Sequence, residues 1–223
     1  MIPATLLFLL LPANAVAGWA DDAAAARGAC ATDPTPCEVV DTLRIRESRA
    51  GTWFVQDDRL TPQMVPLLLD RMNRETRPEL RRALTHGIIA LIPYDDPTWH
   101  PAWIDLATTD ADEGVRSTAI VALRRAPRSL AEPALRKALQ HDDAETRARA
   151  ADAMGGHADA AVFVDALVAA VDDADLNVRR EVVGALGKTR SPDARAVVEA
   201  VDPVGDEQLA RERSRALDRI DGR

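Results

Sequence analysis

The side chains that could carry out chemistry in this chain do not form a recognisable catalytic or metal-binding motif. The four histidines could ligate a metal or act as general bases, but none is paired with another His or a Cys at the spacing of metal ligands. The chain has no G-x-S-x-G nucleophile motif and no glycine-rich phosphate loop. We therefore expect no catalytic residue, no bound cofactor and no metal site. The histidines are His86, His100, His141 and His157.

Clusters of aspartate raise the alternative of calcium binding, because carboxylate oxygens are the ligands that calcium prefers. The clusters are Asp142-Asp143 and the group Asp172, Asp173 and Asp175. The 12-residue loop with its terminal Glu that such a site requires is missing. Each cluster instead precedes an expected helix, where a carboxylate accepts hydrogen bonds from the free N–H groups. Helix capping is therefore the preferred interpretation.

The two cysteines, Cys30 and Cys37, are separated by six residues. A redox-active pair usually has two intervening residues, and a zinc site needs about four ligands. In an oxidising compartment the two thiols would instead close a short loop. We predict a structural disulfide, on the condition that the protein is exported.

The N-terminal segment supports export. Residues 1–17 are uncharged and mostly apolar, and they contain two A-x-A motifs that end at Ala15 and Ala17. This pattern is typical of a cleaved signal peptide and predicts a periplasmic or extracellular protein with no membrane span after cleavage. An uncleaved membrane anchor is the alternative, although Pro12 and Asn14 interrupt an apolar stretch that should number about 20 residues. A buried cytosolic helix is a third interpretation.

The composition favours packed helices and excludes one class of partner. The 223 residues are 47% hydrophobic but only 4% aromatic, and alanine is abundant, so helices can approach one another closely. The formal net charge is −8, whereas proteins that bind nucleic acid non-specifically rely on a basic surface. We expect no nucleic-acid partner.

One arginine recurs at intervals of 31 to 35 residues. An acid stands four residues before it in four of five copies, and only the first copy differs, with Arg77. A small residue follows six positions later in four copies and would let a neighbouring backbone come close. Gly155-Gly156 and Gly187 stand where these helices should end, which suggests C-caps. The recurring arginines are Arg81, Arg116, Arg147, Arg179 and Arg211.

The residues before and between these arginines indicate the domain boundaries. From Thr61 onward, apolar residues at spacings of three and four predict a second set of helices, which makes residues 61–223 one all-α repeat domain. Residues 18–60 are expected to form a linker and an N-terminal cap. Within it, residues 21–37 read as irregular, 39–45 as a short helix and 53–55 as an apolar cluster.

Three segments carry a family resemblance: DADEGVRSTAIVALRR, DDAETRARAADAMGG and DADLNVRREVVGALG. They resemble HEAT-type repeats, in the short bacterial form also described as phycobilisome-lyase-like. The resemblance covers roughly Thr61 to Ile220 and implies a right-handed α-solenoid of about five antiparallel helix pairs. It also implies a ladder of salt bridges between successive repeats, formed by Asp112, Arg116, Asp143, Arg147, Asp175 and Arg179.

By the same resemblance, the second helices should line a concave side that binds a partner. The expected function is a non-catalytic scaffold for a protein or peptide. The alternatives are a bilin-lyase-like or other HEAT-repeat enzyme or accessory subunit, and a purely structural envelope component. The iron-dependent hydroxylases with this repeat need His-Glu pairs, and the chain has no His-Glu dipeptide. Candidate partner-face residues are Arg82, Arg149, Arg180, Glu181 and Arg213.

Overall fold

The computed structural model describes residues 18–49, 51, 53–91, 102–203 and 205–223. They form two compact units, and the boundary between the units falls within helix α5 (Ala102–Thr108). The segment expected to be a signal peptide, residues 1–17, lies outside the described residues, as does His100. None of the helices in the described ranges is both long and apolar enough to cross a bilayer.

The N-terminal unit combines helices with one small sheet. Helix α1 packs on α3, α2 packs on the same helix, and strand β2 lies against α4. The two strands pair antiparallel, with Ile45 opposite Val55 and Glu47 opposite Trp53. The elements are α1 (Gly18–Ala29), α2 (Thr35–Asp41), β1 (Ile45–Glu47), β2 (Trp53–Val55), the 3-10 turn η3 (Pro62–Met64), α3 (Val65–Arg74) and α4 (Pro78–Leu91).

The expectation of an irregular linker over residues 21–37 is wrong, because α1 and the start of α2 occupy most of it. Helix α1 is tied to the unit by Arg27, whose guanidinium lies 2.9 Å from Asp41 and 2.9 Å from Asp70 of α3. The short helix expected over residues 39–45 ends at Asp41, and the chain then turns into β1. Gly51, at φ +77°, allows the return into β2.

Cys30 and Cys37 lie at disulfide distance, with their Cα atoms 6.0 Å apart. Cys30 follows the last residue of α1, and Cys37 is a buried residue of α2. A bond between them would therefore join the end of one helix to the next.

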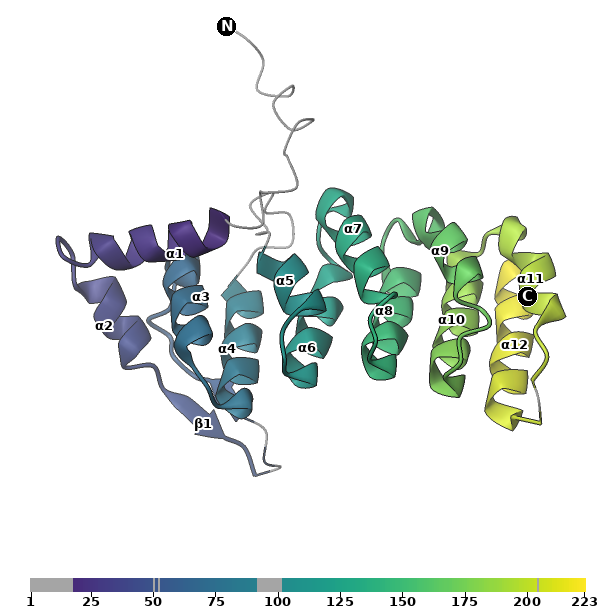
Figure 1. The fold of residues 1–223 in the computed structure, drawn as a ribbon, viewed down its shortest axis with the longest axis horizontal. Helices are drawn as coiled ribbons and strands as arrows, with labels where there is room; N and C mark the ends of the chain where they lie inside the picture. The colour runs from purple at the N-terminus through teal and green to yellow at the C-terminus, as the bar shows by residue number, and fades with distance from the viewer. Residues whose placement is uncertain (1–17, 50, 52, 92–101, 204) are drawn as a thin grey trace, which may run out of the picture. The chain divides into compact units, whose positions relative to one another are not determined.

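The C-terminal unit is built from helix pairs (Figure 1). They make an all-α solenoid, in which the second helix of each pair in this unit packs on the second helix of the next. In Figure 1, α8, α10 and α12 stand side by side in that order. The elements are α6 (Glu113–Leu123), α7 (Arg128–Ala138), α8 (Ala144–Gly156), η4 (Ala160–Phe163), α9 (Val164–Ala169), α10 (Leu176–Thr189), η5 (Pro192–Ala194), α11 (Arg195–Ala200) and α12 (Glu207–Ile220).

Small residues set how closely these second helices pack. A Cβ added to Gly155 of α8 would meet the Cα of Ala185 at 2.6 Å, which is closer than real Cβ atoms approach other atoms. The interpretation of Gly155-Gly156 and Gly187 as C-caps is therefore wrong. These glycines lie within α8 and α10, and α10 instead ends at Arg190, which adopts the left-handed conformation.

Candidate functional site

The recurring acids cap the second helices of the C-terminal unit. The carboxylates of Asp112, Asp143 and Asp175 accept hydrogen bonds from backbone N–H groups in the first turns of α6, α8 and α10. These N–H groups have no partner within the helix, and a negative charge is favoured at a helix N-terminus. The fourth cap is Asp206, which accepts from the N–H of Leu209 and starts α12.

Arg116 connects one repeat to the next. Its Nη2 lies 3.0 Å from Asp143 Oδ2, and its Nε donates to Thr146 Oγ1 over 2.9 Å. Its Nη1 donates to the carbonyl of Asp110 in its own repeat. The Thr146 hydroxyl and N–H, together with Arg116, lower the pKa of Asp143 to about 2. The arginine thus holds its own turn and the next helix cap together.

The next connection uses a different acid from the one implied by the resemblance. Arg147 donates to both carboxylate oxygens of Asp173, each over 2.8 Å, and to the carbonyls of His141 and Asp142. Asp175 caps α10 and has no ion pair among the described residues, so the expectation that it is the ladder acid is wrong. Asp173 reaches Arg147 because it lies two residues earlier in the turn, and there it also accepts from the N–H of Asp175.

The last connection uses a different arginine. Arg180 pairs with Asp206, whose Oδ1 lies 3.1 Å from Arg180 Nε. Arg179, the expected member, has its Nε buried with no hydrogen-bond partner among the described residues. The pairing changes from Arg179 to Arg180 because Asp206, and not Glu207, caps α12. The last repeat is therefore one residue out of register with the others. Arg180, expected on the partner face, therefore also holds two helices together.

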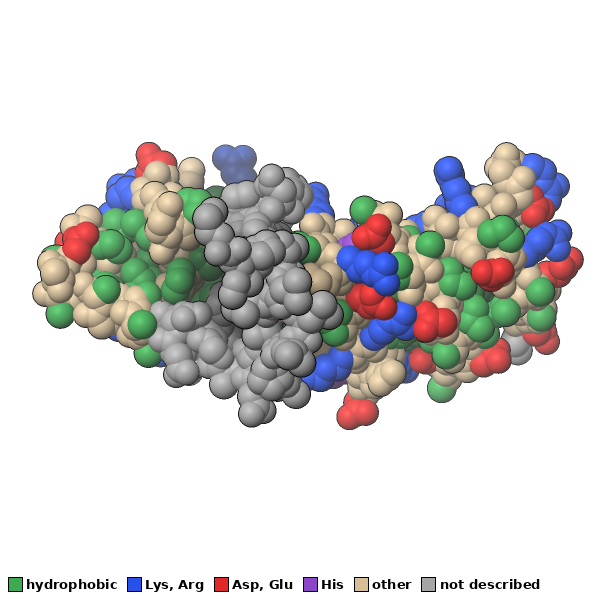
Figure 2. Space-filling view, turned by 90° about the horizontal axis from the view of Figure 1, so that it is seen from above, with side chains coloured by type: hydrophobic (Ala, Val, Ile, Leu, Met, Phe, Trp, Pro, Cys, Tyr) green, Lys and Arg blue, Asp and Glu red, His purple; other side chains and the backbone are tan. Residues whose placement is uncertain are grey.

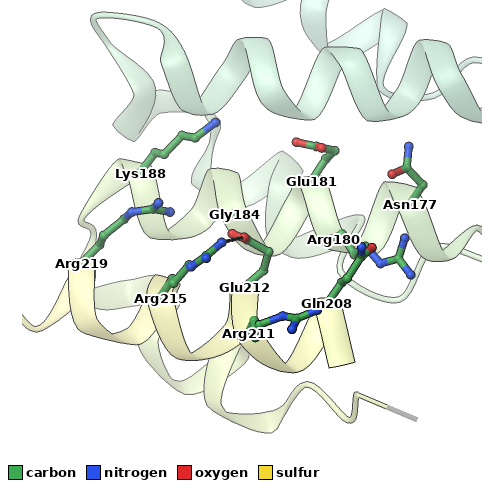
Figure 3. A pocket seen from close by; sticks show the side chains of 10 residues that line it. All are labelled: Asn177, Arg180, Glu181, Gly184, Lys188, Gln208, Arg211, Glu212, Arg215 and Arg219. Carbon is green, nitrogen blue, oxygen red and sulfur yellow. Dashed lines mark hydrogen bonds and ion pairs between the residues drawn. The ribbon is translucent and has the colours of Figure 1, made fainter. Parts of the chain in front are cut away.

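A groove of about 400 Å³ lies between α10 and α12 and is here called the basic groove (Figure 3). Five of its lining residues carry a positive charge and two carry a negative charge. By contrast, Figure 2 shows one face on which acidic and basic side chains are interspersed over the C-terminal unit. The lining residues are Asn177, Arg180, Glu181, Gly184, Lys188, Gln208, Arg211, Glu212, Arg215 and Arg219.

Three arginines on α12 supply the cations on one side of this groove. Arg211, Arg215 and Arg219 are four residues apart and therefore share one face of the helix. Figure 3 shows Arg215 directed toward Glu212, Arg211 extending toward Gln208, and Arg219 lying nearest to Lys188 of α10. In the sequence Arg211 is one of the recurring arginines, and this repeat pattern hid the stripe on α12. The spacing of four was the signal that could have revealed it.

A second groove of about 310 Å³ lies beside the first and is here called the acidic groove. It shares Asn177 and Glu181 with the basic groove. Burial raises the pKa of Glu181, and the negative charge of Asp152 adds to the shift. Among the described residues, Glu181 has no hydrogen-bond partner. The lining residues are Glu145, Ala148, Arg149, Asp152, Asn177 and Glu181.

The structure brings together only part of the expected partner face. Arg149, Arg180 and Glu181 line the two grooves. The expectation that Arg213 belongs to the partner face is wrong. Its Nη2 donates to the carbonyl of Glu199 of α11, and it lines neither groove. Arg82 belongs to α4 in the N-terminal unit, so it is not part of this site.

Two of the described histidines, His141 and His157, make hydrogen bonds within the protein. His157 is buried, its Nε2 lies 3.1 Å from the carbonyl oxygen of Ala126, and its Nδ1 accepts from the N–H of Asp159. His141 Nδ1 accepts from the N–H of Asp143. Across the described ranges there is no group of three or more His, Cys, Asp or Glu residues arranged to hold a metal ion.

Comparison with known proteins identifies the repeat. The sequence profile that describes HEAT repeats matches residues 100–163 and 132–217. A search of curated protein sequences finds no match. Human deoxyhypusine hydroxylase in complex with glycerol is similar in structure, with 21% identity, a TM-score of 0.47, and coverage of 75% of this chain and 71% of the hydroxylase. An engineered protein is also similar, with 17% identity, a TM-score of 0.44, and coverage of 93% and 89%.

Proposed function

Because the chain belongs to the HEAT repeat family, we propose that it is a non-catalytic binding scaffold. It engages a protein or peptide through the face formed by α8, α10 and α12. The observation that carries this proposal is the pair of adjacent charged grooves on that face. Open, extended surfaces of stacked repeats are suited to long contacts rather than to enclosing a small molecule.

The distribution of charge supports this use of the face. Arg116 and Arg147 are largely buried by their structural contacts, whereas the side chains of Arg211 and Arg215 are 60% and 61% exposed. Exposed arginines beside a groove are frequent anchors of protein interfaces, since they combine a planar charge with several donors. The ladder thus supports the scaffold, and the stripe on α12 is available to a partner.

Site-specific photocrosslinking in the native cell tests the proposal. A benzophenone side chain is placed at Gln208, an exposed residue that lines the basic groove, and, as a matched control, at Arg128 on the first helix α7. We expect a discrete crosslinked partner from position 208 only, and its loss when Arg211 and Arg215 are both changed to Glu.

Arg180 is unsuitable for this test, because its reversal would also break the pair with Asp206. A purified partner identified by mass spectrometry should then bind the full chain in solution. Identical crosslinks from both positions, or crosslinks that survive the double reversal, would contradict the proposed face.

We also propose that the protein is exported and that residues 1–17 are removed. The cysteine pair at disulfide distance supports this, since such bonds persist in oxidising compartments. N-terminal sequencing of the mature protein checks it, with a new N-terminus after Ala17 expected. An intact Met1 would contradict cleavage.

A further inference from the structure

The basic and acidic grooves form one surface whose charge changes sign across α10. Both are lined by Asn177 and Glu181, so the surface is continuous. The acidic groove has three carboxylates and one arginine, whereas the basic groove has five cations and two carboxylates. This excess of cations runs against the net charge of −8 for the whole chain.

Much of this charge is already paired within the protein. Arg215 lies 2.6 Å from Glu212, and Lys188 lies 2.5 Å from Asp152. Arg149 lies 2.7 Å from Glu145. These pairs hold neighbouring side chains in place and leave little net charge of their own.

Three charges remain weakly paired. Among the residues that the structure describes, Arg211 has one ion-pair partner, Glu207, at 3.9 Å. Arg219 has its Nη1 buried, and no hydrogen-bond partner for that atom is found in the described part of the chain. Glu181 is half-buried between the grooves, and the described residues offer it no hydrogen-bond donor. Buried donors and charges without partners are costly, so a ligand that supplies the missing partners gains affinity.

We propose that the partner presents an extended bipolar segment: an acidic tract of about four residues beside a lysine or arginine. This inference rests on the scaffold function proposed above. The acidic tract lies along Arg211, Arg215 and Arg219, and the cation sits against Glu181. From Arg211 to Arg219 the helix rises about 12 Å, which is the length of about four extended residues.

The acidic tract and the cation of the segment each match groups on the protein surface. A carboxylate can accept two parallel hydrogen bonds from one guanidinium, so an Asp or Glu tract matches the arginine stripe. An ammonium or guanidinium beside Glu181 would supply the hydrogen bonds that this carboxylate lacks. Charge order across the surface then fixes the register and direction of the bound segment.

Synthetic peptides test the proposal on the full chain. The bipolar probe joins four alternating Asp and Glu residues through two glycines to a pair of lysines, and it is made with the lysines at either end. An acid-only probe replaces the lysines with serine, and a third probe reverses every charge. Binding is measured by fluorescence anisotropy at about 0.1 M salt, where charges act over about 10 Å.

We expect one orientation of the bipolar probe to bind at least fivefold more tightly than the acid-only probe, and the charge-reversed probe not to bind. Changing both Arg211 and Arg215 to Glu should weaken binding at least tenfold. Glu181→Gln should abolish only the preference for the lysine-bearing probe. The matched control changes both Arg128 and Arg195 to Glu. It makes the same change of charge outside both grooves and should alter affinity less than twofold.

Circular dichroism checks that each variant is folded.

Three results would overturn the bipolar segment. The first is that neither orientation of the bipolar probe binds. The second is that the acid-only probe binds as tightly as the bipolar probe. The third is that inorganic polyphosphate competes as well as the bipolar probe, which would indicate a general anion site. If any of these is found while crosslinks from position 208 still depend on Arg211 and Arg215, the scaffold function stands and only the segment is rejected. Absence of any crosslinked partner from position 208 in the otherwise unchanged protein would reject the scaffold function itself.

Discussion

Gly187 of α10 faces Ala216 of α12 so closely that a Cβ on the glycine would meet the Ala216 Cα at 2.5 Å. The same arrangement joins Gly155 of α8 to Ala185 of α10. Successive second helices are thus in backbone contact near their C-terminal ends. This contact sets the spacing of the helices that border both grooves.

Gly187→Ala should destabilise the protein by about 1–3 kcal/mol, because the added methyl group overpacks a contact between two backbones. Gly184→Ala is the matched control in the same helix. Its Cβ would meet only Glu212 Oε2, at an ordinary 3.5 Å. This control should be neutral or stabilise by up to about 1 kcal/mol, since alanine favours the helix. Urea unfolding of both variants measures the difference, and equal effects would contradict the contact.

Arg116→Ala should lower the free energy of unfolding by about 2 kcal/mol. The change removes hydrogen bonds to Asp143, Thr146 and the carbonyl of Asp110, and it leaves those partners unsatisfied. The exposed pair of Arg128 with Glu132 provides the control, where Arg128→Ala should cost less than about 0.5 kcal/mol. Similar losses in the two variants would show that the connection between repeats contributes little to stability.

Acid should weaken the connection made by Asp143. Its pKa is lowered from 3.8 to about 2 in the folded protein, so the charged carboxylate favours folding above about pH 4. This stabilisation is lost as the pH falls through about 2. Asp143→Asn keeps a good helix cap but removes the charge. The thermal midpoint of this variant should be lower than that of the wild type at pH 7, and the difference should shrink towards pH 2. A difference independent of pH would contradict the assignment.

Reduction of Cys30 and Cys37 should destabilise the N-terminal unit by about 2 kcal/mol, the amount expected for a short closed loop. Hydrogen exchange should speed up in α1 and α2 and stay unchanged in α8 and α10. The variant with both cysteines changed to Ser should show the same exchange with and without reductant. Free thiols titrated in the mature, untreated protein would contradict the predicted disulfide.

The second helices were predictable because their signals are local. An acid that caps a helix and an arginine four residues later can both be read within one turn, as at Asp112 and Arg116. The strands at residues 45–47 and 53–55 were missed, because three residues are too few to show alternation. Their position depends on packing of β2 against α4, where Gly87 meets Val55.

The candidate site was only partly predictable, because the repeat changes phase at its end. Glu207 occupies the expected acid position, yet Asp206 forms the cap, and this one-residue shift exchanges Arg179 for Arg180 in the pairing. Arg211 was consequently aligned with the structural arginines. The grooves themselves depend on which side chains remain unpaired after the helices stack, and no spacing rule contains that information.

The arginine connections also define the module by which this array could be lengthened or shortened. Arg147 binds the turn that precedes its own helix and, through Asp173, the turn that precedes the next second helix. A cut between helix pairs would therefore separate each arginine from one of its partners. An exchangeable module would have to span a full repeat interval of 31 to 35 residues and keep the arginine of one second helix together with the acid of the following turn.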